Sequence, residues 1–436
     1  MNTLADNSHC RPLRTNVSSL ARSGRLLAQR VLPSYVTVFI ACLIVCLASD
    51  SSVKAATIQF LDAYTKATGV SGDGSVVTYN IVSGGITAGH VIRNGVDSDA
   101  FPVPPQPPYT WGFSATSAVS QDGHTVVGIT NWGGAPESPT VWKNADPAYL
   151  LPVPADGVNY GPANAVNADG SVIVGQVAVS NSPYRLVAAR WQTDGTSQII
   201  GHFVGGNQST ATGVSGNGAI VVGWGDVHIA AYQENGESYV AVDYSSLPFI
   251  WSAANGMQRL PLPFLAGGSA NAISENGATV VGTISGQDGS IAGLWQIDPQ
   301  AYLGGGGAAP QFHALGFLPG DTSSVATAVS GDGSVVVGYS SGPSGNSAFL
   351  WTSQLGMVDL NTWLPSLGVD LTNAQLSLVT GISADGRKIV GNGSLYTGPG
   401  SGRGWIVTLP VPEPSSFALA ICAIGIGLFV RARRSR

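Results

Sequence analysis

The chain has 436 residues, of which only 10% are charged and 44% are hydrophobic. That hydrophobic share is large enough to bury a core, so the composition excludes an intrinsically disordered chain. Residues 56–410 carry nine basic and 22 acidic side chains, a balance of −13 that argues against nucleic acid as a partner, because phosphates require a basic face.

The positions of the cysteines and the number of glycines limit further the kind of protein that this sequence can encode. All four cysteines lie near the chain ends, at Cys10, Cys42, Cys46 and Cys422. Residues 56–410 therefore hold no disulfide, no thiolate metal site and no cysteine nucleophile. Glycine, with 58 residues, is nearly twice as frequent as the roughly 7% of average proteins, which predicts short strands joined by tight turns.

Residues 1–55 have the layout of a secretory signal peptide. Basic residues precede an apolar run, Val36–Leu47, and the segment ends with small residues at the two positions that signal peptidase recognises, Val53 and Ala55. A run of about a dozen residues is too short for a comfortable membrane span. We therefore expect cleavage after Ala55, with an uncleaved signal anchor as the alternative.

One stretch is repeated along residues 56–410, and its clearest copy is Thr327–Ser340. A Gly-Asp-Gly corner at residues 331–333 separates two runs of alternating or β-branched residues. This pattern predicts a hairpin, because glycine readily adopts the positive φ that tight hairpin turns need. The corner glycine recurs seven times, at intervals of 47 to 59 residues: Gly74, Gly123, Gly170, Gly218, Gly277, Gly333 and Gly386.

Each unit contains more than this hairpin. A third strand ends in an aromatic residue in most units, usually Trp, as in Ala348–Trp351, and a short fourth strand follows in most of them. Four short strands in about 50 residues are typical of a β-propeller blade. The sequence therefore predicts an all-β fold, a seven-bladed β-propeller of four-stranded blades over residues 56–410. A β-solenoid is the alternative, but a unit near 50 residues is too long for one rung.

The two ends of the repeat region predict how the ring closes. The last unit reaches the C-terminal segment with only three strands, whereas residues 57–62 form a lone strand before the first unit. We expect this N-terminal strand to complete the last blade, since a shared sheet removes the exposed edges of an open array.

The repeats resemble the HAF repeats of bacterial extracellular proteins. The resemblance rests on Ala328–Gly338, Ala348–Trp351 and Gly356–Leu360, and it is best over residues 312–360. Ser347 stands where the family motif has histidine. The resemblance implies a secreted repeat protein and supplies no catalytic residue.

The C-terminal segment, residues 411–436, resembles the PEP-CTERM sorting signal of Gram-negative bacteria. It combines a Pro-Glu-Pro motif, one apolar run at Phe417–Val430 and a basic terminus. The residues that carry the motif are Pro412, Glu413, Pro414, Arg431, Arg433 and Arg434. The resemblance implies an exosortase-type sorting enzyme as partner, a transient anchor in the inner membrane, and release to the cell surface or the extracellular polymer. A permanent tail anchor is the alternative.

The repeated corners suggest a first candidate site. Each corner carries a carboxylate or amide that could bind calcium or close a turn on its own backbone, and the second interpretation is favoured because asparagine replaces aspartate twice. These residues are Asp73, Asp122, Asp169, Asn217, Asn276, Asp332 and Asp385.

Aromatic residues form the second candidate site. The repeated Trp residues could stack on sugars, but their regular position favours packing between blades. Aromatics in the loops that enter each first strand are better candidates for ligand binding, since such loops often surround one mouth of a propeller channel and would suit a polysaccharide. They are Tyr109, Trp111, Tyr160, Phe203, Phe317 and Trp363.

The sequence carries no recognisable enzyme motif. The histidines lack metal-binding spacing, and no nucleophile elbow or phosphate loop is complete. The leading interpretation is an exported, non-enzymatic, monomeric propeller without cofactor or metal, which serves as a structural or binding component of the cell surface. A lectin-like polysaccharide-binding module and a polysaccharide hydrolase or lyase remain as alternatives, although nothing selects a catalytic carboxylate pair.

Overall fold

The structure is a computed structural model. It describes residues 55–84, 86–98, 112–132, 137–143, 148–179, 185–228, 232–234, 237–239, 244–263, 267–286, 289–305, 310–395 and 402–410. The predicted signal peptide, apart from Ala55, and the predicted sorting segment lie outside these ranges. Within them, no helix is both long and apolar enough to span a membrane.

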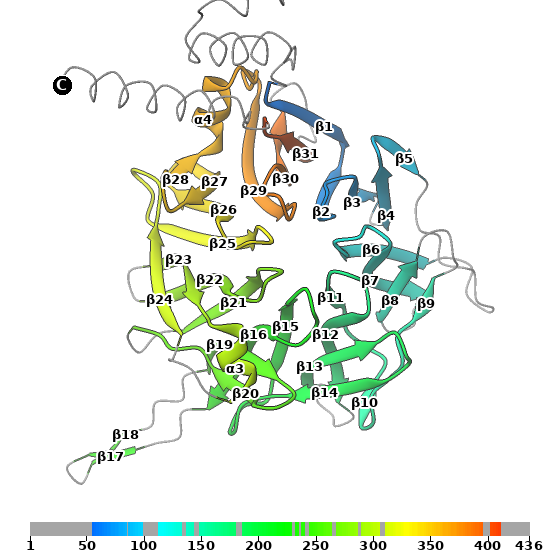
Figure 1. The fold of residues 1–436 in the computed structure, drawn as a ribbon, viewed down its shortest axis with the longest axis vertical. Helices are drawn as coiled ribbons and strands as arrows, with labels where there is room; N and C mark the ends of the chain where they lie inside the picture. Colours follow the sequence, from blue (N-terminus) through cyan, green and yellow to red (C-terminus); the bar gives the residue numbers. More distant parts are fainter. Residues whose placement is uncertain are drawn as a thin grey trace, which may run out of the picture. The chain divides into compact units, whose positions relative to one another are not determined.

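Seven antiparallel sheets are arranged around a common axis, which confirms the predicted seven-bladed β-propeller (Figure 1). Blade 1 runs outward as β2 (Thr65–Val70), β3 (Val76–Ser83), β4 (Ile86–Arg93) and β5 (Val96–Ser98). Blade 2 consists of β6 (Gly112–Val119), β7 (Thr125–Trp132), β8 (Ser138–Lys143) and β9 (Tyr149–Leu150). Blade 3 has two short inner strands, β10 (Gly157–Val158) and β11 (Ala163–Val166), beside β12 (Val172–Val179), β13 (Arg185–Gln192) and β14 (Ser197–Gly201).

The middle blades repeat this order. Blade 4 consists of β15 (Ser209–Val214), β16 (Val221–His228), β19 (Tyr244–Ser252) and β20 (Gly256–Arg259). A separate pair, β17 (Tyr232–Glu234) and β18 (Glu237–Tyr239), lies between β16 and β19 in the chain. Blade 5 consists of β21 (Gly267–Ile273), β22 (Thr279–Gly286), β23 (Gly289–Gln296) and β24 (Gln311–Gly316), with helix α3 (Pro299–Leu303) before β24.

The last two blades complete the ring. Blade 6 consists of β25 (Ser323–Val329), β26 (Val335–Gly342), β27 (Gly345–Thr352) and β28 (Gly356–Asp359), followed by helix α4 (Leu360–Ser366). Blade 7 consists of β29 (Ala374–Ile382), β30 (Lys388–Leu395), β31 (Gly402–Thr408) and, as its outermost strand, β1 (Thr57–Ala63).

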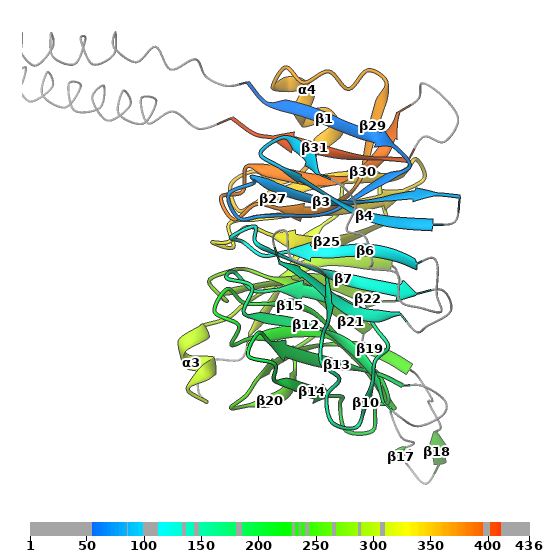
Figure 2. The same ribbon diagram turned by 90° about the vertical axis from the view of Figure 1, so that its right-hand side faces the viewer.

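The pairing of β1 with β31 confirms the predicted closure. Thr57 lies opposite Thr408 and Phe60 opposite Trp405 in an antiparallel register, and the two strands lie side by side when the ring is seen from its edge (Figure 2). The first strand of the propeller therefore seals its last blade.

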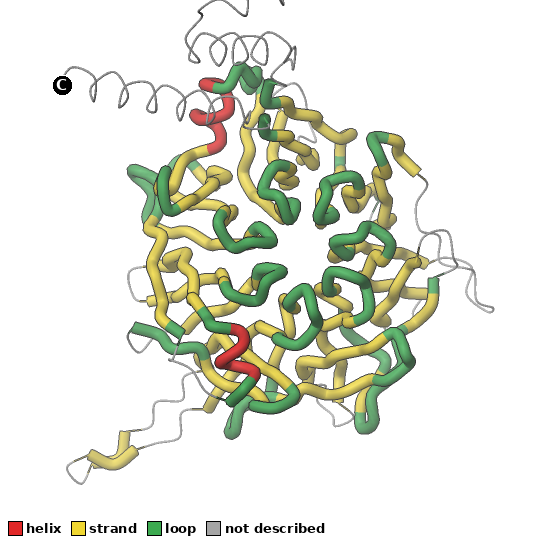
Figure 3. The backbone as a smooth tube through the Cα atoms, in the orientation of Figure 1, coloured by secondary structure: helices red, strands yellow, loops and turns green. Residues whose placement is uncertain are grey.

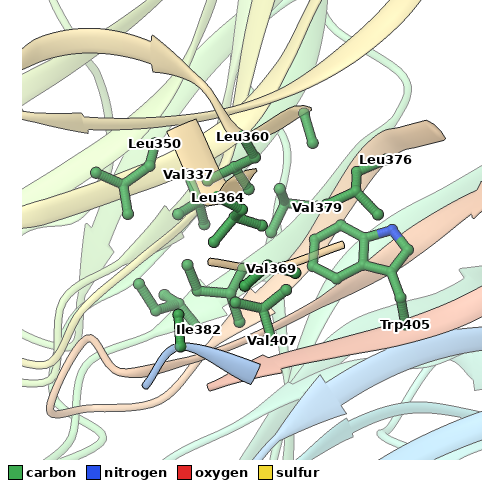
Figure 4. Packing of buried hydrophobic residues seen from close by; sticks show 13 residues of the cluster. Val337, Leu350, Leu360, Leu364, Val369, Leu376, Val379, Ile382, Trp405 and Val407 are labelled. Atoms are coloured by element: carbon green, nitrogen blue, oxygen red, sulfur yellow. The ribbon is translucent and has the colours of Figure 1, made fainter. Parts of the chain in front are cut away.

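The hydrophobic core lies between the blades. Each of the seven interfaces between neighbouring blades holds one cluster of buried apolar side chains. Figure 4 shows the cluster between blades 6 and 7, where Trp405 packs with Val337, Leu376 and Val379. All seven clusters consist of residues between Ala56 and Leu409, within the compact unit Ala55–Pro410. This unit thus contains its whole described core and is expected to fold on its own.

The repeated Trp residues belong to these interfaces, as the sequence predicted. Trp191, Trp295 and Trp405 are fully buried. The indole N–H of Trp191 donates to the Pro152 carbonyl (2.9 Å), and that of Trp295 donates to the Pro261 carbonyl (2.8 Å), each in the preceding blade. The Trp side chains therefore join neighbouring blades.

A repeated glycine in the second strand allows this packing. At Gly338 in β26, an added Cβ would lie 2.0 Å from the carbonyl oxygen of Val325 and 2.9 Å from the ring of Phe349. The aromatic ring of the third strand covers the backbone where the glycine leaves space. Tyr79 occupies the equivalent position in blade 1 and stacks on His90 at 5.1 Å, so a pair of rings replaces the single one.

Candidate functional site

The seven corner turns lie closest to the axis. Each joins the first strand of its blade to the second, and the turns surround the centre of the ring (Figure 3). Every corner glycine has positive φ, between 71° and 80°. A side chain would strain the backbone there, which explains why the corner ends in glycine.

The corner carboxylates and amides hold their own turns. In blade 6, Oδ1 of Asp332 accepts hydrogen bonds from the Ser330 hydroxyl (2.7 Å) and from the backbone N–H of Ser334 (2.9 Å). The Ser330 hydroxyl oxygen also accepts the N–H of Val335 (3.0 Å). Asn217 and Asn276 accept equivalent bonds through Oδ1. These bonds confirm the interpretation of the corner as a self-closing turn.

Successive corners are joined by backbone hydrogen bonds that run once around the axis. One backbone N–H in each corner donates to a backbone carbonyl of the next corner, with N···O distances of 2.9 to 3.3 Å. The seven bonds are Gly72 to Gln121, Asp122 to Ala168, Ala168 to Gly216, Gly216 to Glu275, Asn276 to Gly331, Gly331 to Ala384, and Ala384 to Gly72. The last bond links blade 7 to blade 1, so the chain of bonds is closed. We call this set the corner ring.

A second set of contacts lies three residues before each corner serine, or before Asn167, which replaces the serine in blade 3. There the first strand of every blade has a β-bulge, seen as a register shift in all seven blades. The bulged residue is always Ser, Thr or Asn. Thr212, Thr327 and Thr380 donate to carbonyls of the next blade, at Ala270 (2.6 Å), Val379 (2.7 Å) and Ala67 (3.0 Å). The bulge therefore aims a polar side chain at the neighbouring blade.

Amide side chains form a third type of link, in blades 1 and 7. Asn392 accepts the N–H of Ala67 (2.9 Å) and donates to its carbonyl (3.2 Å), so its amide pairs with the backbone as a strand residue would. Asn80 pairs with Thr116 in the same way. The first of these pairs strengthens the joint where the ring closes.

The corner carboxyls of Asp73, Asp122, Asp169 and Asp332 are more acidic than usual. The backbone N–H of Ser75 has the largest influence on Asp73 and, with the Ser71 and Ser75 hydroxyls, lowers the pKa of its carboxyl. At Asp332, burial alone would raise the pKa, but the hydrogen bonds from Ser330 and Ser334 outweigh it and the pKa is lowered. The pKa values of Asp122 and Asp169 are lowered as well. These groups are therefore anionic at neutral pH.

The corners do not bring their carboxylates into a metal-binding cluster. Within the part of the chain that the structure describes, no group of three or more His, Cys, Asp or Glu side chains is placed to hold a metal ion. Each corner carboxylate instead uses its Oδ1 atom within its own turn.

The predicted aromatic loop residues are not gathered at one place. Tyr109 and Trp111 lie outside the described residues. Phe203 is half-buried against Phe249 of blade 4, with ring centroids 6.4 Å apart. Trp363 lies on α4, which follows the outermost strand of blade 6 at the rim of the ring (Figure 1), and packs onto the cluster between blades 6 and 7. Trp363 therefore does not border the axis.

Tyr160 and Phe317, like Phe203 between β14 and β15, lie in loops that enter a blade. The backbone carbonyl of Tyr160 accepts the N–H of Ala178 (2.8 Å), which places Tyr160 beside β12. Phe317, between β24 and β25, is 45% exposed, and its neighbour Leu318 is buried. Of the four predicted aromatics that the structure describes, Phe317 is the most exposed and the best placed to meet a ligand.

Sequence reasoning did not identify the bulged residues or the paired amides. Their signal is present in the sequence, because Ser, Thr or Asn stands three residues before the corner residue Ser71 and its equivalents in every unit. A polar residue at a fixed place in an apolar strand indicates a bulge or a buried polar partner.

Comparison with known proteins gives a fold likeness only. No protein-family model and no curated protein matches the sequence. The structure is similar to TolB from Acinetobacter baumannii, with 13% identity and a TM-score of 0.35 over 54% of this chain; the match spans 52% of that protein, about half its length. It is also similar to an oligogalacturonate lyase from Vibrio parahaemolyticus, with 9% identity and a TM-score of 0.48 over 83% of this chain and 98% of that one. The Dos1 propeller is similar as well, with 12% identity and a TM-score of 0.41 over 81% of this chain and 94% of that one.

Proposed function

We propose that this protein is an exported, non-enzymatic propeller that serves as a structural or binding component of the bacterial cell surface or its extracellular polymer. The observation that carries the proposal is the use of the repeated polar residues. The corner carboxylates and the bulged hydroxyls, which are the most regular polar groups of the chain, make hydrogen bonds that hold turns and blades together. Their regularity is explained by cohesion of the ring.

The proposed location rests on the terminal segments. The signal-peptide layout of residues 1–55 and the Pro-Glu-Pro motif with its basic terminus imply export and sorting by an exosortase-type enzyme. The propeller unit ends at Pro410, immediately before that segment, so removal of residues 411–436 would leave every described blade intact.

The proposed sorting is tested in a Gram-negative host that carries an exosortase. We expect the full chain to reach the cell surface without its C-terminal segment, as measured by mass spectrometry of the surface fraction. The variant P412A/P414A should stay uncut in the membrane fraction, because the motif that the sorting enzyme recognises is lost. Ser415→Ala is the matched control and should be processed normally. Equal processing of P412A/P414A and the wild type would contradict the proposed location.

Polysaccharide binding is a second candidate function, favoured by the exposure of Phe317. An exposed aromatic ring can stack on a sugar face. We expect Phe317→Ala to weaken pull-down on the host's extracellular polysaccharide by about threefold to tenfold. Leu355, which is 55% exposed in the turn between β27 and β28, provides the control Leu355→Ala. Binding that is absent from the wild type, or equal in both variants, would remove this candidate.

A further inference from the structure

The connection between the closing strand and the rest of the ring is a single residue. β1 ends at Ala63 and β2 begins at Thr65, so the chain passes from the outer edge of blade 7 to the inner edge of blade 1 through Tyr64. The Tyr64 N–H donates to the Gly402 carbonyl of blade 7, and its own carbonyl accepts the Val82 N–H of blade 1. Tyr64 is therefore the hinge between the two blades.

This hinge is strained. Tyr64 has φ of +63°, in the left-handed region that residues with a side chain rarely adopt. Its side chain is 55% exposed, so packing does little to favour this conformation. Without the reversal at Tyr64, residues 57–70 would form one extended strand.

The contacts of β1 can be made by any copy of the chain. Ile58 and Phe60 pack on the cluster between blades 6 and 7, and Leu61 packs between blades 7 and 1. Thr57, Gln59 and Asp62 are exposed. The interactions that hold β1 on β31 would thus be the same if β1 came from a second molecule, and short strained hinges favour such an exchange.

We propose that β1 exchanges between two copies of this chain, so that the first strand of one copy completes blade 7 of another. The exchanged form relieves the positive φ at Tyr64 and keeps the pairing of β1 with β31. It is in equilibrium with the closed monomer that the sequence predicts. The proposal does not depend on the proposed function, because it rests on the geometry of β1 and Tyr64 alone.

Cysteine cross-linking tests the exchange directly, since residues 55–410 contain no cysteine. Thr57 and Thr408 are exposed and directly opposite each other across β1 and β31, close enough for a disulfide. The propeller unit carrying T57C is incubated with a second unit carrying T408C and then oxidised. A disulfide-linked heterodimer on a non-reducing gel is the expected result. Replacing the second unit by one carrying T193C, exposed in blade 3, measures random oxidation and should give no such product.

Variants of the hinge distinguish strand exchange from other forms of association. Tyr64→Gly removes the strain of the closed form and should lower the association constant by about tenfold or more, whereas the β-branched Tyr64→Val should raise it by a similar factor. Tyr149→Val, at another exposed tyrosine, should leave it unchanged. The absence of heterodimer at the highest soluble concentration, or an amount of heterodimer equal in Tyr64→Gly and Tyr64→Val, would overturn the proposal.

Discussion

At the scale of single residues, the corner turns show why aspartate and asparagine both occur in one repeat. The turn needs an oxygen acceptor two residues after the serine and two residues before the backbone N–H that it accepts. Oδ1 of Asp332 and Oδ1 of Asn276 meet this need with the same partners. The charge of the carboxylate is therefore not required for the turn, although it strengthens the hydrogen bonds.

Because of the lowered pKa values, the stability of the ring should decrease at acidic pH. A carboxyl whose folded pKa lies below its unfolded value of about 3.9 contributes stability that is complete above the unfolded pKa and is lost as the pH falls through the folded pKa. Asp73, Asp169 and Asp332 have such lowered pKa values. We expect the free energy of unfolding in urea to decrease as the pH is lowered from 5 toward 2.

Substitutions that convert corner aspartates to asparagine, or the reverse, test this explanation of the pH dependence. The triple variant D73N/D169N/D332N should show a smaller decrease between pH 5 and pH 2 than the wild type, because its corners no longer titrate. Asn217→Asp, the reverse change in blade 4, should enlarge the decrease. An unchanged pH dependence in both variants would mean that the corner carboxylates do not contribute.

At the scale of elements, the glycine in the second strand and the bulge in the first strand act together as one structural feature of each blade. At Gly338, beside the bulge, the space that a Cβ would need is taken by a carbonyl oxygen of the first strand and by the aromatic ring of the third. The alternation of apolar residues predicted these strands, and the corner glycines predicted their turns. Alternation alone does not locate the bulges, whose signal is the Ser, Thr or Asn that recurs three residues before Ser71 and its equivalents.

Substitution of this glycine should be costly. Gly338→Ala would place Cβ 2.0 Å from the backbone oxygen of Val325, which cannot move without disturbing the blade. We expect a loss of about 3 kcal/mol in the free energy of unfolding, measured with urea. At Gly402 in β31, no heavy atom of the described residues beyond its chain neighbours lies within 4 Å of an added Cβ. Gly402→Ala should be neutral or stabilising by about 0.5 kcal/mol. Equal effects of both substitutions on the free energy of unfolding would contradict this explanation of the glycine in the second strand.

Helix α4 explains why Trp363 lies at the rim of the ring and not beside its axis. The short fourth strand that the sequence predicts in most units is β28 in blade 6, and it ends at Asp359, whose side chain caps α4 by accepting the N–H of Asn361 (2.8 Å). The chain after β28 therefore forms a helix at the rim, and the partly buried Trp363 packs onto the cluster between blades 6 and 7. The direction of a connecting segment depends on such local capping, which cannot be predicted from the repeat pattern.

At the scale of the whole molecule, the ring could be predicted because every unit carries the same signals. Seven corners gave the number of blades, and the lone strand before the first unit indicated the closure that β1 and β31 make. The candidate ligand residues lie in the segments that differ most between units. Their placement depends on loop length and local turns, so repetition alone could not gather Phe203, Phe317 and Trp363 into one site.

Native-state hydrogen exchange of the corner amides tests most directly whether the ring is closed. The donors of the corner ring are the N–H groups of Gly72, Asp122, Ala168, Gly216, Asn276, Gly331 and Ala384. In a ring sealed by β1, no blade is terminal, and we expect all seven amides to exchange with one common opening free energy that equals that of global unfolding. Faster exchange of Gly72 and Ala384 than of Ala168 and Gly216 would show instead that blades 7 and 1 are the open ends of an unsealed array.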